Sequence, residues 1–258
     1  MTISLSIEPD GRIAHVRLSN PAGANAVNLT FATTFAEVIS EIERKAPRVV
    51  VLSAEGKVFC AGGDLGAFNT AGQNLPHLMQ EIVGKTHDAL LRLEKLKIPV
   101  VAAVEGTAGG IGLSLILAAD IVIAGPNAQF VAGYTAVGLT PDGGMTRRLP
   151  SLIGARRAAD MMLRNARISA ETAAAWGLVS SVCAQEEVFE TALQISRQLA
   201  NGPKEAISRA VELLRAGQDM DLAEALAAEE EAIVSMCRSK DAKEGIAAFV
   251  ERRSPSFS

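Results

Sequence analysis

The sequence is poor in the residues that mark several common classes of protein. Phe, Trp and Tyr make up 4% of its 258 residues, with one tryptophan and one tyrosine. Its three cysteines, Cys60, Cys183 and Cys237, lie far apart and form no Cys-x-x-Cys pair. This spacing argues against a disulfide framework, so we expect a cytoplasmic protein. The three histidines show no spacing typical of metal ligands, and we expect no metal site.

Long apolar runs and a positive charge balance are also lacking. No run reaches the roughly 18–20 residues that a bilayer span requires, and the N-terminus has no apolar core of a signal peptide. The formal net charge is −4, which does not favour nucleic acid or an anionic membrane as a partner. We therefore expect no nucleic-acid partner and no membrane partner.

The chain does contain a large apolar fraction, 48%, arranged in alternating strand-like and helix-like segments. Strands are predicted at 3–7, 13–18, 49–53, 100–104, 120–124, 129–131 and 179–184. Helices are predicted at 29–44, 75–96, 113–119, 155–164, 187–200, 203–215, 222–236 and 241–251. This order predicts an α/β fold with mostly parallel pairing, followed by a helical C-terminal region. The polar stretch 69–74 is predicted to be mobile. We expect residues 1–200 and 201–258 to form one structural unit.

The stretch 99–148 contains the most informative pattern. A buried strand at 100–104 leads into the glycine-rich segment 106–112 and then into an apolar helix. This order places backbone N–H groups and the positive end of a helix dipole beneath any ligand above the loop. Asp142 stands between Pro141 and Gly143 at a second predicted helix start. Such a loop can stabilise the negative oxygen of an enolate, and one carboxylate can remove a proton to form the enolate and return a proton to it.

Each of these features also has a plainer interpretation. The glycine segment does not fit the dinucleotide pattern G-x-G-x-x-G. The residues around Ser114 lack the second glycine of G-x-S-x-G, so this serine is not expected to be a hydrolase nucleophile. Asp142, taken alone, could simply satisfy free N–H groups at the start of a helix.

Several motifs, in order and over nearly the whole chain, resemble the crotonase (enoyl-CoA hydratase/isomerase) superfamily. They are NAVN at 25–28, FCAGGDL at 59–65, KIPVVAAVEGTAGGIGLSL at 97–115, AAD at 118–120, GLTPDGGMTRRLP at 138–150, AAAWGLVSSV at 173–182 and EGIAAFVERRSP at 244–255. The resemblance implies a spiral of repeated β-β-α turns and a helical C-terminal region that forms homo-trimers, often paired into hexamers. It also implies an acyl-CoA thioester as substrate, with no cofactor beyond the coenzyme A of that substrate.

The same resemblance assigns roles to individual positions. The family's oxyanion hole, formed by two backbone N–H groups, falls on Gly63 and Ile111. A backbone donor works whatever the side chain, and losing one such donor costs other enzymes roughly 10²–10³ in rate. The resemblance also implies substrate or CoA contacts at Ala26, Ala61, Asp64, Leu65, Gly110, Ser114, Tyr134 and His87.

The carboxylates are where the sequence departs from the hydratases of this family. Hydratases hold water between two glutamates, and those positions are Ser114 and Tyr134 here. Neither side chain can act as a carboxylate base, so hydratase activity is not expected. Asp142 instead resembles the aspartate of the ring-1,2-epoxyphenylacetyl-CoA isomerases and related Δ3,Δ2-enoyl-CoA isomerases. One carboxylate suits a 1,3-proton shift, because the same group is base and then acid.

Two alternatives remain open from the sequence. Asp142 and His87 also match the nucleophile and the base of 4-chlorobenzoyl-CoA dehalogenases, which implies dehalogenase or acyl-CoA hydrolase chemistry. Gly63 and Thr86 stand where that enzyme has Phe and Trp, so most of its aromatic cage is missing. The third interpretation is a paralogue that binds acyl-CoA without catalysis.

Overall fold

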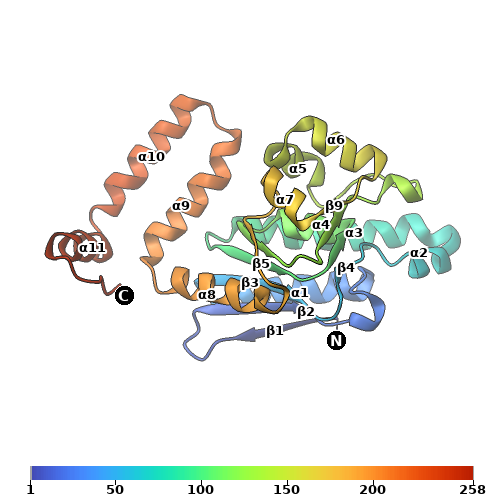
Figure 1. Ribbon diagram of the computed structural model, residues 1–258, viewed down its shortest axis with the longest axis horizontal. Helices are drawn as coiled ribbons and strands as arrows, with labels where there is room; N and C mark the ends of the chain where they lie inside the picture. The colour runs from blue at the N-terminus through green and yellow to red at the C-terminus, as the bar shows by residue number, and fades with distance from the viewer. Residues whose placement is uncertain (1, 258) are drawn as a thin grey trace.

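The computed structural model describes residues 2–257, and within them ten strands form two sheets (Figure 1). The strands are β1 Ile3–Ile7, β2 Ile13–Leu18, β3 Val49–Ala54, β4 Val58–Cys60, β5 Val100–Val104, β6 Thr107–Gly109, β7 Ile121–Ala124, β8 Gln129–Val131, β9 Ile168–Ser169 and β10 Ser181–Val182. The α-helices are α1 Leu29–Lys45, α2 Leu65–Ala71, α3 Leu75–Lys95, α4 Ile111–Leu117, α5 Met145–Ile153, α6 Ala155–Arg164, α7 Ala170–Trp176, α8 Val188–Ala200, α9 Lys204–Ala216, α10 Leu222–Met236 and α11 Lys240–Glu251.

From β3 to β8, successive strands alternate between the two sheets. The larger sheet has the order β1-β2-β3-β5-β7-β10, and the smaller has the order β4-β6-β8-β9. The pairs β3/β4, β5/β6 and β7/β8 each give one strand to each sheet, and helices follow each pair. Pairing is parallel except at β1–β2 and β8–β9. This arrangement confirms the predicted α/β spiral of β-β-α turns.

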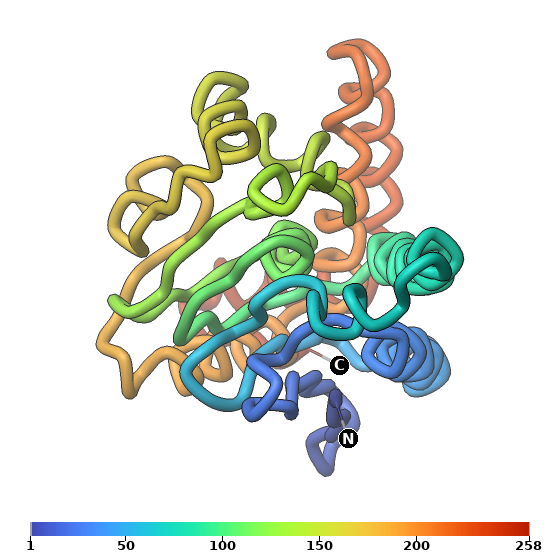
Figure 2. Tube along the Cα trace, turned by 90° about the vertical axis from the view of Figure 1, so that its right-hand side faces the viewer, coloured from blue at the N-terminus to red at the C-terminus, as the bar shows by residue number. Residues whose placement is uncertain are grey.

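The larger sheet is buried on both faces, which explains its continuous apolar strands. In β3, Val49 and Val51 pack with α8, while Val50 and Leu52 face the main core on the other side. This is the two-residue period of a strand. Helices α1 and α3 lie side by side along one edge of the main core (Figure 2). Asn28 caps α1, because its side chain accepts a hydrogen bond from the N–H of Phe31.

Two predictions of local structure are corrected. The segment 69–74, for which no helix was predicted, is helical, because α2 continues to Ala71 and a 3₁₀ helix spans Gly72–Asn74. Asp64 caps α2, and Phe68 is its one buried side chain. The helix therefore lacks the repeating apolar positions by which a helix is recognised in a sequence. The helix predicted to start at Asp142 begins three residues later, at Met145.

Helices α9, α10 and α11 extend away from the spiral (Figure 1). The guanidinium group of Arg215 fixes α9 to the core. It pairs with Asp120 at 2.7 Å and donates to the carbonyl oxygens of Glu94, Leu96 and Ile98. Large apolar side chains of α10 and α11 are exposed, namely Leu222, Leu226, Ile233, Val234, Ile246, Phe249 and Val250. Within the described chain, no helix has both the length and the apolar character of a membrane span.

Candidate active site

A cavity of about 130 Å³ lies where the loops after β4, β6 and β8 meet α3. Of the predicted site residues, it is lined by Ala61, Gly63, Leu65, Gly110, Ile111, Tyr134 and Asp142. The rest of its wall is mainly apolar and comes largely from α2 and α3. Asp142 supplies the only carboxylate among the described residues that line it. The structure therefore brings the predicted base and the predicted oxyanion donors into one enclosure.

The backbone N–H groups of Gly63 and Ile111 have no acceptor within the described part of the protein. Ile111 is the first residue of α4, so its N–H has no partner inside that helix. Gly63 lies beside Val27, whose N–H and C=O bond to the neighbouring Gly62 and Asp64 instead. Two free donors in one apolar cavity can stabilise a negative oxygen, as an oxyanion hole requires.

Glycines allow the two donor loops to approach each other. Gly62 has φ +104°, and a Cβ there would lie 3.1 Å from the carbonyl oxygen of Gly109. Gly110 has φ +54°, and its Cβ would lie 3.3 Å from the Cα of Gly62. A side chain at either position would separate the loops that carry the donors.

The Phe68 ring packs against Gly63. A Cβ built on Gly63 would lie 2.5 Å from Cε2 of that ring, which is closer than side-chain atoms approach. Phe68 is 8% exposed and lines the cavity from α2. The space that an aromatic side chain at position 63 would need is therefore already filled.

Asp142 lies in the turn between η3 (Thr135–Val137) and α5, and Gly143 fixes this turn. Gly143 has φ +62°, and a Cβ there would lie 2.5 Å from Cδ1 of Ile111 and 2.6 Å from Cβ of Ser114. Ser114 is fully buried in α4, and its hydroxyl donates to the Asp142 carbonyl oxygen at 2.9 Å. Ser114 thus supports the Asp142 turn and does not line the cavity.

The Tyr134 hydroxyl donates a hydrogen bond to Oδ1 of Asp142. Burial raises the pKa of Asp142, while the hydrogen bond from Tyr134 and, when its ring is charged, the nearby His87 act in the lowering direction. Burial and the Asp142 charge raise the pKa of Tyr134, so the phenol keeps its proton. The apolar surroundings therefore dominate at Asp142, a balance that the sequence left open.

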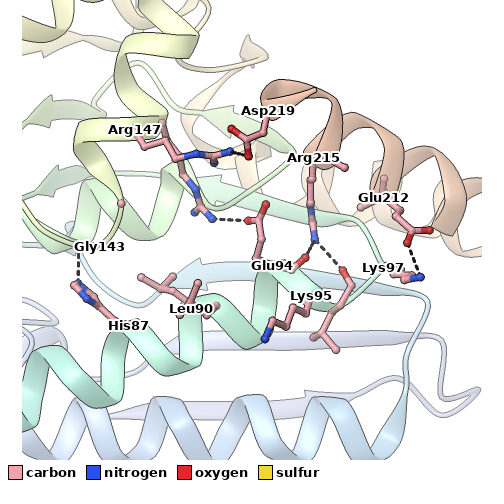
Figure 3. Close-up of a pocket in the computed structure, with 16 residues that line it drawn as sticks. His87, Leu90, Glu94, Lys95, Lys97, Gly143, Arg147, Glu212, Arg215 and Asp219 are labelled. Carbon is pink, nitrogen blue, oxygen red and sulfur yellow. Dashed lines mark hydrogen bonds and ion pairs between the residues drawn. The ribbon is translucent and has the colours of Figure 1, made fainter. Parts of the chain in front are cut away.

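His87 holds the other side of the same turn. Its Nε2 accepts a hydrogen bond from the N–H of Gly143 at 3.0 Å, so Nε2 carries no proton in this arrangement. His87 does not line the small cavity but a second hollow of about 740 Å³ behind it (Figure 3). Three side-chain ion pairs, Arg147–Asp219, Arg148–Glu94 and Lys97–Glu212, surround this hollow, and Arg215 also faces it. Each of these charged groups has an ion-pair partner, that of Arg215 being Asp120.

The predicted CoA contacts at Ala26, Ala61, Asp64 and Leu65 lie on two adjoining segments. The N–H of Ala61 donates to the Ala24 carbonyl oxygen, and the N–H of Asp64 donates to that of Val27. Asp64 caps α2 and also accepts a hydrogen bond from Asn28 at 3.2 Å. The N–H of Ala67 and the Asn28 amide lower the Asp64 pKa. Ala26 and Asp64 do not line the cavity.

Sequence reasoning missed the role of Asn25. This residue is 1% exposed and adopts a left-handed conformation with φ +53°. Its side chain accepts from the N–H of Asn20 and donates to the carbonyl oxygens of Glu55 and Val58. The signal was the asparagine itself, because asparagine tolerates positive φ and bonds to nearby backbone.

Comparisons with known proteins agree with this geometry. A family model described as enoyl-CoA hydratase/isomerase matches residues 8–258. The chain belongs to the enoyl-CoA hydratase/isomerase family. Among individual members of the family, the 1,2-epoxyphenylacetyl-CoA isomerase of Escherichia coli K12 is 34% identical over 93% of this chain and 92% of its own length. The 2,3-dehydroadipyl-CoA hydratase of the same organism is 32% identical over 98% of both chains.

Solved structures of the family show the same fold. The crystal structure of an enoyl-CoA hydratase from Polaromonas sp. JS666 matches with a TM-score of 0.92 at 33% identity, covering 99% of both chains. Isomerases and hydratases are thus similarly close to this member of the family, so overall likeness does not choose between the two reactions. The choice depends on the side chains of the cavity.

The other reactive side chains of this family member lie outside the cavity. Cys60 is fully buried, and burial raises the pKa of its thiol to about 12. No cluster of three or more His, Cys, Asp or Glu suited to a metal ion occurs among residues 2–257. Asp142 and Tyr134 are therefore the only ionisable side chains among the described residues that line the cavity.

Proposed function

We propose that the protein is an acyl-CoA isomerase that shifts a C=C bond by a 1,3-proton transfer through a thioester enolate. The observation that carries this proposal is the lone Asp142 carboxylate in a cavity that also holds the free N–H groups of Gly63 and Ile111. The similarity to the E. coli 1,2-epoxyphenylacetyl-CoA isomerase supports it. Ser114 and Tyr134, at the hydratase glutamate positions, leave no second carboxylate to activate water.

The proposed reaction needs only these groups. Asp142 removes a proton from the α-carbon of a 3-enoyl thioester, and the electron pair moves into the thioester. The charge that develops on the thioester oxygen is stabilised by the N–H groups of Gly63 and Ile111, which are already in place. Asp142 then returns the proton to the γ-carbon, which gives the conjugated 2-enoyl thioester. The chain supplies base, acid and oxyanion donors, and the proposal requires no cofactor.

A substrate panel with the Asp142→Asn variant tests this proposal. The panel contains 3-enoyl-CoA, 2-enoyl-CoA and aryl-acyl-CoA thioesters. The wild type is expected to isomerise the 3-enoyl thioester, and the variant to lose roughly 10²–10⁴ in rate because general acid–base catalysis contributes that much. Full isomerase turnover by the variant, or water addition as the main reaction of the wild type, would overturn the proposal.

The dehalogenase or hydrolase alternative is the second candidate, because Asp142 could also act as a nucleophile. That chemistry needs a base for water, and His87 faces the other hollow with Nε2 engaged by Gly143. Halide release, or isotopic oxygen entering Asp142 in a single turnover, would favour this candidate. Tight acyl-CoA binding without any turnover would favour the non-catalytic paralogue.

We also propose that the chain forms a homo-trimer, or a hexamer of paired trimers, through α10 and α11. The exposed apolar side chains there support this, since Phe249 is 85% exposed and Val250 is 75% exposed. Phe249→Asp should reduce the molar mass measured by sedimentation towards that of a monomer. An unchanged molar mass would contradict the proposed interface.

A further inference from the structure

The two carboxylate oxygens of Asp142 have different surroundings. Oδ1 accepts the hydrogen bond from the Tyr134 hydroxyl. No described residue donates a hydrogen bond to Oδ2. The Ser114 hydroxyl, which is the other hydroxyl nearby, donates to the backbone carbonyl oxygen of Asp142 instead. Only one oxygen of the carboxylate is therefore free to meet a substrate.

Tyr134 is itself held in place from several sides. Its carbonyl oxygen accepts hydrogen bonds from the N–H groups of Val137 and Leu139, at 3.1 and 3.0 Å. These bonds close the η3 turn and direct the residue into the cavity, which the ring lines. A Cβ on Gly110 would lie 3.9 Å from Cζ of the ring, so the phenol sits against the loop that leads into α4. The donor to Asp142 is thus fixed before any substrate arrives.

We propose, on the basis of the proposed isomerase function, that Tyr134 is a positioning residue. It confines the proton that Asp142 takes from the substrate α-carbon to Oδ2 of the carboxyl group. In the first step the substrate α-C–H bond breaks, the Oδ2–H bond forms and the electron pair enters the enolate. In the second step the Oδ2–H bond breaks and the γ-C–H bond forms. The phenol keeps its own proton throughout, because it donates to Oδ1 whether Asp142 is ionised or protonated.

This arrangement has a consequence for where the proton goes. A carboxyl group whose Oδ1 accepts the phenol hydrogen bond holds the captured proton on Oδ2, the oxygen that the proposal assigns to the substrate carbons. Without the phenol, the carboxyl group can rotate and place the proton on the far oxygen, where exchange with solvent competes with its return. Tyr134 should therefore favour direct transfer of the substrate proton over exchange.

The Tyr134→Phe variant tests the proposal, with Thr135→Val as its matched control. Thr135 is the adjacent residue, and its hydroxyl donates to the carbonyl oxygens of Met162 and Leu163 and accepts from the Asn165 amide, all away from Asp142. Both variants remove one hydroxyl from the same turn. Tyr134→Phe is expected to lower kcat on the order of 10²-fold with little change in KM, since a reacting group misplaced by about 1 Å costs that much. Thr135→Val is expected to retain the wild-type kcat.

Isotope retention gives a readout that a merely structural role would not change. With a 3-enoyl thioester deuterated at the α-carbon, the wild type should deliver much of the deuterium to the γ-carbon of the product. Tyr134→Phe should deliver a smaller fraction and exchange the rest with water, while Thr135→Val should match the wild type. Equal retention in all three proteins would overturn the proposal.

The pH dependence of turnover provides a second readout. The titratable groups beside Asp142 are Tyr134 and His87. Because the phenol stabilises the ionised carboxylate, its removal should raise the pKa of Asp142 and move the acid limb of kcat/KM to higher pH. His87 is present in both proteins, so the difference between their limbs reports on Asp142.

Infrared difference spectra separate the failure of this inference from that of the proposed function. The Asp142 carboxyl band is isolated by subtracting the spectrum of Asp142→Asn, in the wild-type and Tyr134→Phe backgrounds. If the wild type shows no isomerase activity, the proposed function fails, but a carboxyl group that protonates at higher pH without the phenol still supports the contact. An unchanged carboxyl titration in Tyr134→Phe overturns the positioning role, whatever the activity.

Discussion

Replacement of Gly143 by alanine should destabilise the protein through two separable effects. The residue has φ +62°, and a non-glycine residue in this left-handed region costs about 1–2 kcal/mol. The new Cβ would also lie 2.5 Å from Cδ1 of Ile111 and 2.6 Å from Cβ of Ser114. Overpacking of this kind typically costs about 1–3 kcal/mol. The expected loss in free energy of unfolding is therefore about 2–5 kcal/mol.

Gly138→Ala is the control for the backbone effect alone. Gly138 has φ +74°, but its added Cβ would meet no atom within 4 Å. This variant should lose only about 1–2 kcal/mol. Urea unfolding followed by circular dichroism measures both losses, at one protein concentration because any self-association would make stability depend on concentration. Equal losses in the two variants would refute the packing of the Asp142 turn against α4.

Three further outcomes are expected. Arg215→Met should lower the free energy of unfolding by about 3–5 kcal/mol, because it breaks the largely buried ion pair with Asp120. Lys97→Met removes the more exposed ion pair with Glu212 and should lower it by less than about 1 kcal/mol. Urea unfolding of the two variants measures both losses. Cys60 should resist alkylation in the folded protein while the exposed Cys237 reacts, as read by mass spectrometry. Asp142→Asn should raise Tm at neutral pH, because a raised carboxyl pKa means that ionisation opposes folding. Stability of the wild type then falls as pH rises through that pKa, so the gain should vanish in acid, which calorimetry at several pH values would detect.

The parts of the fold that the sequence predicted well are those with a strong apolar pattern. The continuous apolar run of β3 predicts a strand buried on both faces, and the apolar stripe of α1, including Phe31, Phe35 and Ile42, predicts a helix with one buried face. The structure contains both. The region 65–74 has no such stripe. Its helical state depends on the Asp64 cap and on one buried ring, Phe68, and neither produces a periodic signal.

The candidate site also has a part that could be predicted from the sequence and a part that could not. The family resemblance placed the oxyanion donors on Gly63 and Ile111, and both N–H groups lack an acceptor among the described residues. The hydrogen bond from Tyr134 to Asp142 could not be predicted, since the two residues are separated by an irregular turn whose path no propensity specifies. The engagement of His87 by Gly143 joins segments that are 56 positions apart, and it arises only when α3 packs beside the turn.

The contact between Phe68 and Gly63 restricts how this cavity can evolve. A lineage that acquires a side chain at position 63 must first, or at the same time, replace the ring at position 68 with something smaller. The reverse order, loss of the ring while Gly63 remains, opens empty volume beside an oxyanion donor. The two positions should therefore change as a linked pair, and laboratory selection for bulkier acyl groups should yield substitutions at 68 before any at 63.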